Sequence, residues 1–156
     1  MNPTKNDIPA NTRGEMVSLL NAILADALDL FSQTKQAHWN VKGANFIALH
    51  ELFDDVAEAV EGYTDEIAER AVMLGGIAMG TARVAAANST LKEYPVHITS
   101  GAEHVAALSD ALAATGKNVR DGIETADKAG DADTVDRTLS HYRPKFTPRS
   151  QAANSY

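Results

Sequence analysis

The sequence lacks the features of several common protein classes. Its 156 residues include no cysteine, so the chain can form neither a disulfide nor a thiolate metal site, which is compatible with a reducing cytosol. No apolar run approaches the roughly 20 residues that a membrane-spanning helix needs. The N-terminal segment has no apolar core of a secretory signal. We therefore expect a soluble, cytoplasmic protein with no membrane partner.

Several catalytic motifs are missing as well. The chain contains no glycine-rich phosphate loop, no nucleophile elbow and no zinc-finger pattern. No glutamate is followed by a histidine three residues later, so the Glu-x-x-His motif of di-iron sites inside helix bundles is absent. This absence argues against a metal site in the interior of a bundle.

Acidic residues are absent from the end of the chain, although the net charge is −7. Residues 1–136 contain 10 basic and 21 acidic residues, a net charge of −11, whereas residues 137–156 contain four basic and no acidic residues. An acidic body attracts cations and repels nucleic acid. A short basic tail can reverse that repulsion locally, so non-specific DNA binding is expected to depend on the termini.

Apolar residues recur every three or four positions in four long segments, and no segment alternates like a β-strand. The chain length fits one domain, and 44% hydrophobic residues can bury a sizeable core. The spacing predicts helices at about residues 13–39, 45–74, 81–88, 100–128 and 131–142. Four long helices with a short helix in the middle connection indicate an all-α four-helix bundle.

The chain is predicted to have three parts. Residues 1–12 form a flexible N-terminal arm, residues 13–142 form the bundle, and residues 143–156 form a basic, proline-containing tail. Pro144 and Pro148 forbid an unbroken helix in that tail. The fourth helix is therefore predicted to be truncated after about three turns.

A truncated fourth helix has a consequence for the core. It is too short to cover the third long helix, so apolar surface around Leu108 and Leu112 is predicted to stay partly uncovered. The tail could instead cover this surface by folding back through Phe146, its one large purely apolar side chain.

Two pairs of metal-binding residue types are spaced for one helical face. His50 and Asp54 are four residues apart, as are Asp65 and Glu69. At about 100° per residue, all four lie on one stripe, almost opposite to the apolar stripe of the same helix. Imidazole with carboxylate is a ligand set for a divalent transition metal such as iron. A solvated acidic face with structural histidines is the alternative interpretation of these residues.

The two pairs are too far apart to bind one ion within one chain. They are separated by roughly 16 Å along the helix, whereas metal–ligand bonds are about 2 Å long. Because the pairs are symmetric about a point between Ala59 and Val60, an antiparallel second copy would bring the first pair of each chain to the second pair of the other. His38 can join the first pair across a short turn. Glu58 and Glu61 would repel across this axis unless water or a cation intervenes.

A longer set of residues carries a resemblance to a known family. The set comprises His38-Trp39-Asn40, Gly43-Ala44-Asn45-Phe46, His50-Glu51, Asp54, Asp65, Ala68-Glu69-Arg70, Leu74-Gly75-Gly76 and Leu91-Lys92-Glu93-Tyr94-Pro95. It resembles the signature of the DNA-protection-during-starvation (Dps) family of miniferritins, over about residues 12–136. The resemblance implies that His38, His50 and Asp54 of one subunit bind iron together with Asp65 and Glu69 of its two-fold mate.

The resemblance also implies a fold and an activity. It implies a ferritin-like bundle that assembles into a hollow homo-dodecamer, oxidises Fe(II) to Fe(III), preferably with hydrogen peroxide, stores the product and so protects DNA. The family's fourth helix normally continues almost to the C-terminus, and this chain departs from that pattern. Two alternatives stay open: a DNA-binding nucleoid structural protein with secondary iron chemistry, and an assembly-defective paralogue.

Other polar residues and the single tryptophan have less specific signals. By the same resemblance, Trp39 is expected beside the metal site. His97, His104 and His141 match no ligand pattern and are predicted to lie on the surface. Five carboxylates near the end of the third long helix form either a solvated turn or, as the resemblance implies, an acidic iron entrance at a three-fold axis. They are Asp121, Glu124, Asp127, Asp131 and Asp133.

Overall fold

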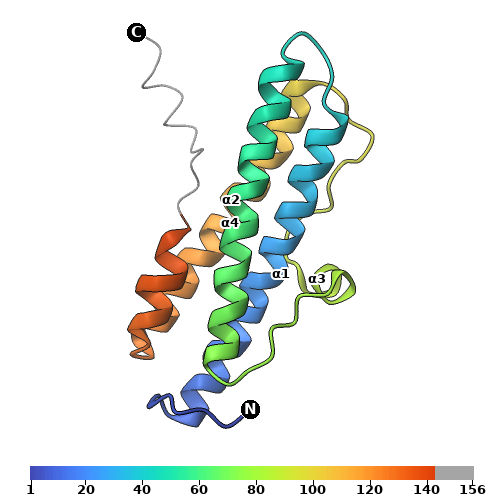
Figure 1. Ribbon diagram of the computed structural model, residues 1–156. Helices are drawn as coiled ribbons and strands as arrows, with labels where there is room; N and C mark the ends of the chain where they lie inside the picture. The colour runs from blue at the N-terminus through green and yellow to red at the C-terminus, as the bar shows by residue number, and fades with distance from the viewer. Residues whose placement is uncertain (143–156) are drawn as a thin grey trace, which may run out of the picture.

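The computed structural model describes residues 1–142, and the predicted all-α bundle is confirmed there (Figure 1). The tail at residues 143–156 lies outside the described residues. The elements are α1 (Ala10–Asn40), α2 (Phe46–Met73), α3 (Ala82–Asn88), α4 (Gly101–Lys128), the π-helical η1 (Thr134–Thr138) and the 3-10 helix η2 (Leu139–His141). All five predicted helical segments are therefore present, with boundaries shifted by a few residues.

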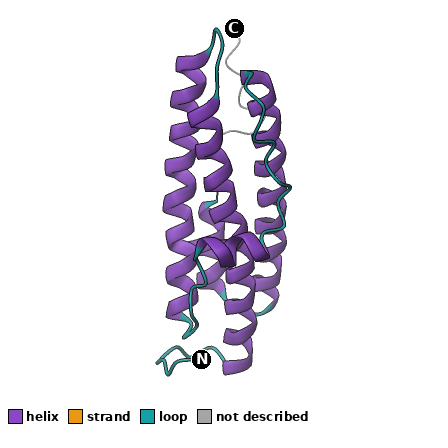
Figure 2. Ribbon diagram, turned by 90° about the vertical axis from the view of Figure 1, so that its right-hand side faces the viewer, coloured by secondary structure: helices purple, strands orange, loops and turns teal. Residues whose placement is uncertain are grey.

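The long helices pack as a bundle in which α1 contacts both α2 and α4. The last segment, η1 with η2, contacts α2 and α4 at the end of the bundle where the N-terminus lies (Figure 1). The short helix α3 contacts α1 and lies across the long helices rather than along them (Figure 2). Within residues 1–142, no other long helix covers the outer face of α1 and α2.

The core is a column of apolar side chains between the long helices. Burial of each large side chain stabilises the fold by about 1.5–3 kcal/mol. The predicted apolar spacing in α1 is confirmed, since its buried apolar residues recur at intervals of three and four. The largest fully buried apolar side chains are Met16, Leu20, Leu24, Leu30, Ile67, Leu74, Leu139, Val41 and Val119.

Local signals set the ends of the helices. Ser100 caps α4 in a capping box: its hydroxyl accepts a bond from the Glu103 N–H, and the Glu103 carboxylate accepts one from the Ser100 N–H. Asn45 is the N-cap of α2, as predicted, but its side chain makes no capping bond. Gly75 ends α2 with a φ of 87°, a left-handed conformation that favours glycine.

Contacts join the N-terminal arm to the end of α2. The backbone N–H of Asn2 donates to the Gly75 carbonyl at 2.7 Å. The guanidinium of Arg13 donates to the carbonyls of Ile8 and Leu74 at 3.0 and 3.1 Å. These bonds place the arm against the bundle, while its flexibility stays a prediction.

A buried polar cluster holds the last segment on α2. Arg70 Nη2 donates to Asp131 Oδ1 at 2.5 Å, and Arg70 Nε donates to the Thr134 hydroxyl oxygen at 2.9 Å. The Thr134 hydroxyl in turn donates to Asp131 Oδ2 at 2.6 Å. All three side chains are buried, so each charge depends on its partner for stabilisation.

The last segment is much shorter than α4, as the truncation hypothesis requires. At 1.5 Å per residue, helical residues 132–141 span about 15 Å, whereas the 28 residues of α4 span about 42 Å. Leu108 is not left uncovered, since it is 4% exposed and packs with Phe53 and Tyr94; the alternative cover through Phe146 lies outside the described residues. Leu112 is only partly buried, as a short fourth helix predicts, whereas Val105, which the apolar spacing places on the buried side of this helix, is 37% exposed.

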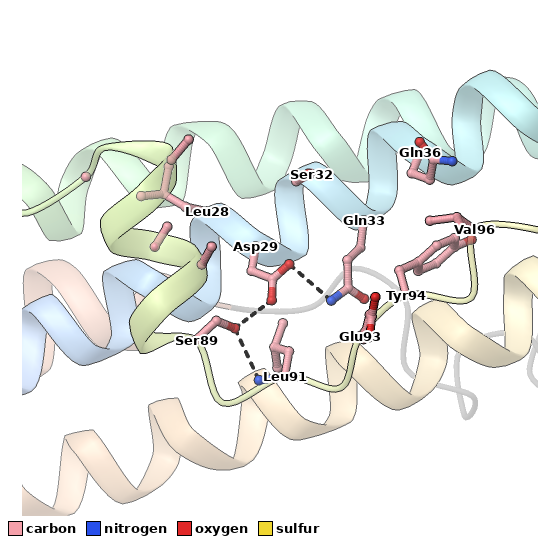
Figure 3. A pocket seen from close by; sticks show the side chains of 14 residues that line it. Leu28, Asp29, Ser32, Gln33, Gln36, Ser89, Leu91, Glu93, Tyr94 and Val96 are labelled. Carbon is pink, nitrogen blue, oxygen red and sulfur yellow. Dashed lines mark hydrogen bonds between the residues drawn. The ribbon is translucent and has the colours of Figure 1, made fainter.

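The middle connection is tied to α1 by a second polar cluster. The buried carboxylate of Asp26 accepts bonds from the Thr90 backbone N–H at 2.6 Å and from Asn118 Nδ2 at 2.8 Å. The Ser89 hydroxyl donates to Asp29 Oδ2 at 2.6 Å (Figure 3). Between α1, α3 and this connection lies a pocket of about 600 Å³. The cluster fixes the middle connection and α4 against α1.

Candidate metal centre

The first three predicted ligands come together at one end of the bundle. His38 is in the last turn of α1, and His50 and Asp54 are in the first turns of α2. Gly43, with a φ of 112°, allows the tight reversal between the helices. The N–H of Lys42 donates to the Thr99 carbonyl at 3.0 Å and anchors this loop next to the start of α4.

The two imidazoles are held in a reciprocal arrangement. The rings of His38 and His50 stack with centroids 3.7 Å apart. Nδ1 of His38 lies 2.9 Å from the His50 carbonyl oxygen, and Nδ1 of His50 lies 2.9 Å from the His38 carbonyl oxygen. Because a carbonyl oxygen only accepts, each Nδ1 must carry the proton.

This proton placement determines what the rings can bind. In a neutral imidazole protonated at Nδ1, the Nε2 atom has a free lone pair. Neither Nε2 atom has a hydrogen-bond partner among the described residues. A backbone carbonyl that fixes the Nδ1 tautomer is the usual support of a metal-binding histidine. The pair therefore presents two nitrogen donors in a defined orientation.

Asp54 lies beside the imidazoles and makes an unexpected ion pair. Its Oδ1 is 2.6 Å from Lys35 Nζ and 3.8 Å from His38 Nδ1. The hydrogen bond from the Lys35 ammonium lowers the pKa of Asp54 below its usual value, so the carboxylate is ionised at neutral pH. Lys35 Nζ also lies 5.8 Å from the centre of the Trp39 ring. Trp39 is 67% exposed and reaches this group only through Lys35, so its place beside a metal site stays a prediction.

Sequence reasoning missed Lys35. Its position three residues before His38 and four before Trp39 places all three on one face of α1. That spacing was a detectable signal. What it did not show is that this face of α1 points toward Asp54 on α2.

The other two predicted ligands lie apart from the first three. Asp65 and Glu69 are exposed on α2, and neither makes a hydrogen bond or ion pair with the described residues. Asp65 borders an open hollow of about 680 Å³ between α1 and α2, together with Glu58 and Glu61. Within residues 1–142, no group of three or more His, Cys, Asp or Glu side chains is placed to hold a metal ion in one chain. His38, His50 and Asp54 therefore do not form a complete metal site by themselves, and Asp65 and Glu69 are separated from them by roughly 16 Å along the helix, as the spacing predicts.

One of the three histidines predicted to be on the surface is buried. His104 is 1% exposed, and its Nδ1 lies 2.6 Å from the Tyr94 hydroxyl. Burial lowers the pKa of His104, and burial raises the pKa of Tyr94 to about 12. The His104 ring packs edge-on against Phe53, the neighbour of Asp54, so it supports the start of α2. His97 and His141 are exposed as predicted.

The five carboxylates at the end of α4 and in the following turn do not all lie on the protein surface. Asp131 is buried and paired with Arg70, because the end of the chain packs onto α2. Asp121 and Glu124 pair instead with Lys117 and Lys128 on the surface of α4. The interpretation of these five carboxylates as one solvated turn is therefore wrong for Asp131.

Comparisons with known proteins place this geometry in a family. A family model described as a ferritin-like domain matches residues 17–141. The DNA protection during starvation protein of Agrobacterium fabrum is 41% identical over 133 residues, which are 85% of this chain and 82% of that protein. The chain belongs to the ferritin-like family. Within it, the chain is one of the DNA protection during starvation, or Dps, proteins.

Solved Dps structures share the fold. Dps of Mycobacterium smegmatis in its tetragonal form superposes with a TM-score of 0.84 at 31% identity, over 90% of this chain and 85% of that chain. DpsC from Streptomyces coelicolor gives a TM-score of 0.85 at 29% identity, over 89% of this chain and 81% of that chain. Within residues 1–142, this Dps protein has no helix long and apolar enough to cross a membrane.

Proposed function

We propose that this Dps protein is an iron-binding and iron-storing miniferritin that oxidises Fe(II) with hydrogen peroxide and so protects DNA. The observation that carries the proposal is the reciprocal bonding of His38 and His50, which leaves both Nε2 atoms available, together with an Asp54 carboxylate oxygen that lies 3.8 Å from His38 Nδ1. Two imidazole nitrogens and a carboxylate suit Fe(II), which is the substrate here rather than a resident cofactor.

The proposed reaction removes both reagents that generate hydroxyl radicals. Two Fe(II) ions each lose one electron, and hydrogen peroxide accepts both electrons together with two protons to give two water molecules. The Fe(III) product then leaves the site for storage. Imidazole and carboxylate groups are both ligands for iron, so the site can bind Fe(II) before its oxidation.

The site needs a second subunit to be complete. We propose that Asp65 and Glu69 of the partner subunit supply the remaining ligands across an isologous two-fold interface. Two features support this: the described residues of one chain do not form a closed site, and the two ligand groups lie on one exposed face of α2. We further propose a hollow dodecamer in the cytoplasm, where the Fe(III) is stored inside the shell.

Iron oxidation by sized oligomer tests this proposal. Purified protein should elute at roughly twelve times the 16.6 kDa chain, and it should oxidise Fe(II) faster with hydrogen peroxide than with air alone. His50→Ala and Asp54→Ala should lose this activity, whereas His97→Ala, at an exposed histidine outside the site, should keep it. Unchanged oxidation by His50→Ala oligomer would contradict the assignment. Elution as a monomer or dimer would support the assembly-defective alternative.

The charge distribution favours a second candidate function, binding of DNA at the nucleoid. The body is strongly acidic, and the last 20 residues are basic and acid-free. Deletion of residues 143–156 should weaken gel-shift binding and lower its salt dependence, since roughly one counterion is released per phosphate contact. Absence of wild-type binding at low salt would exclude a structural role on DNA and leave the iron chemistry untouched.

A further inference from the structure

We propose that Lys35 is a cation that a metal ion displaces from the metal site. Its ammonium pairs with the Asp54 carboxylate until the metal binds, and then it moves onto the face of the Trp39 ring. The inference rests on the proposed metal site, because it requires that Asp54 bind a metal ion in place of the Lys35 ammonium. It makes Lys35 a positioning residue that sets the affinity of the site, rather than a ligand.

The contact between Lys35 and Asp54 is direct and lies next to His38. Lys35 Nζ lies 2.6 Å from Asp54 Oδ1, the same oxygen that faces His38 at 3.8 Å. The ammonium therefore neutralises the one carboxylate that the chain itself brings to the imidazoles. A metal ion of charge +2 that binds this oxygen meets a positive charge a few ångströms away, so both cations cannot stay on it without strong repulsion.

The structure offers the ammonium another position close by. Lys35 Nζ is 5.8 Å from the centre of the Trp39 ring, within the range of a cation–π interaction. The two residues are four apart on α1 and share one face of the helix. Rotation about the flexible lysine side chain is enough to transfer the ammonium from the carboxylate to the indole. The exposed Trp39 ring lies within its reach.

This exchange would lower the affinity of the site for any divalent cation. Each metal ion must displace the ammonium from Asp54, so part of its binding free energy is lost. Weak binding suits a site whose iron is passed on after oxidation. The hydrogen bond from the ammonium also orients the Asp54 carboxylate before the metal binds.

Zinc titration of full-length oligomer tests the role of Lys35 without any redox chemistry. Lys35→Met keeps the length of the side chain and removes its charge, and Lys35→Arg is the matched control that keeps the charge. We expect Lys35→Met to bind Zn(II) about fivefold more tightly than wild type, and Lys35→Arg to bind within about twofold of wild type. Equal or weaker binding by Lys35→Met would overturn the inference.

Fluorescence of Trp39, the only tryptophan of the chain, reports the movement itself. Zn(II) should change the Trp39 emission of wild type as the ammonium reaches the ring, and this change should be lost in Lys35→Met. The same emission change in Lys35→Met would count against the movement. If His50→Ala and Asp54→Ala bind Zn(II) like wild type, the proposed site itself fails. If they lose binding while Lys35→Met matches wild type, only the Lys35 inference fails.

Discussion

The two groups of predicted ligands on α2 differ in how they are held. His50, with His38 and Asp54, lies in a network of bonds within one chain: two Nδ1–carbonyl bonds, a ring stack and an ion pair. Asp65 and Glu69 lie farther along the same helix, exposed and without a partner among the described residues. We call these groups the histidine half and the carboxylate half.

If the proposed shared site is correct, the difference separates the part of the site that folding makes from the part that assembly makes. The histidine half has its geometry and its proton positions fixed before any metal or second chain is present. In the single chain the carboxylate half is a pair of solvated side chains, and the proposed contact with a second subunit would make them ligands. Metal would therefore bind with full affinity only in the oligomer. A single chain, which lacks the partner's ligands, would bind iron weakly.

The largest expected effect comes from blocking the proposed two-fold contact. Ala59 is exposed midway between the two ligand pairs, so Ala59→Arg should separate the subunits there. Loss of outer-shell partners alone weakens metal binding by about 10- to 100-fold, so loss of two direct ligands should exceed about 100-fold. Zinc titration combined with a sizing column measures both effects, and Ala59→Ser is the control. Tight zinc binding by an Ala59→Arg monomer would show that the carboxylate half is not needed.

The second prediction concerns the end of α2 that carries the carboxylate half. Arg70→Met should destabilise the protein by about 3–5 kcal/mol, because it leaves the buried Asp131 carboxylate without its partner. The double variant Arg70→Met with Asp131→Leu should regain most of that stability. Thermal melts of the three proteins check this, and a wild-type melting temperature for Arg70→Met would contradict the importance of the pair.

The third prediction concerns the pH dependence of stability from His104, which packs near the histidine half. Burial lowers the pKa of His104, so the unfolded state binds more protons than the folded state below the ordinary histidine value of about 6.5. Stability from this group is thus complete above about pH 6.5 and is lost as the pH falls toward the lowered value. His104→Gln should flatten this acid dependence in melts at pH 5–7. His97→Gln, at an exposed position, should not change it.

The smallest expected effect is on Asp54 itself. Since the Lys35 ammonium holds the pKa of Asp54 below its usual range, Lys35→Met should raise that pKa toward 3.8. NMR titration of protein labelled at the aspartate carboxyl carbons measures this change, and Asp54→Asn assigns the resonance. An unchanged Asp54 titration in Lys35→Met would mean that the ion pair is not maintained in solution.

Much of the fold could be predicted from single-helix patterns. Apolar spacing located every long helix, because each one buries one continuous face. The stripe shared by the ligand pairs followed from the same periodicity. His104 was predicted wrongly because a lone histidine in the first turn of a helix carries no sign of burial. Its burial depends on Tyr94 and Phe53, which come from other segments.

The spacing of residues along the sequence could not predict which residues of different helices are in contact. Lys35 and Asp54 are 19 residues apart, and their pairing depends on how α1 is rotated against α2. Arg70 and Asp131 are 61 residues apart, and they meet because the last segment turns back onto α2. In both cases the helix positions of the residues were predictable, but the faces that meet were not.

Subunit mixing tests most directly whether the metal site is shared between chains. Asp54→Ala and Asp65→Ala oligomers, each inactive in Fe(II) oxidation, are mixed under conditions that allow subunit exchange, and exchange is verified by mass spectrometry. In an interface between the two variants, one of the two sites loses both mutated ligands while the other keeps its full set. The account predicts partial recovery of ferroxidase activity in mixed oligomers. No recovery, despite demonstrated exchange, would contradict a shared site.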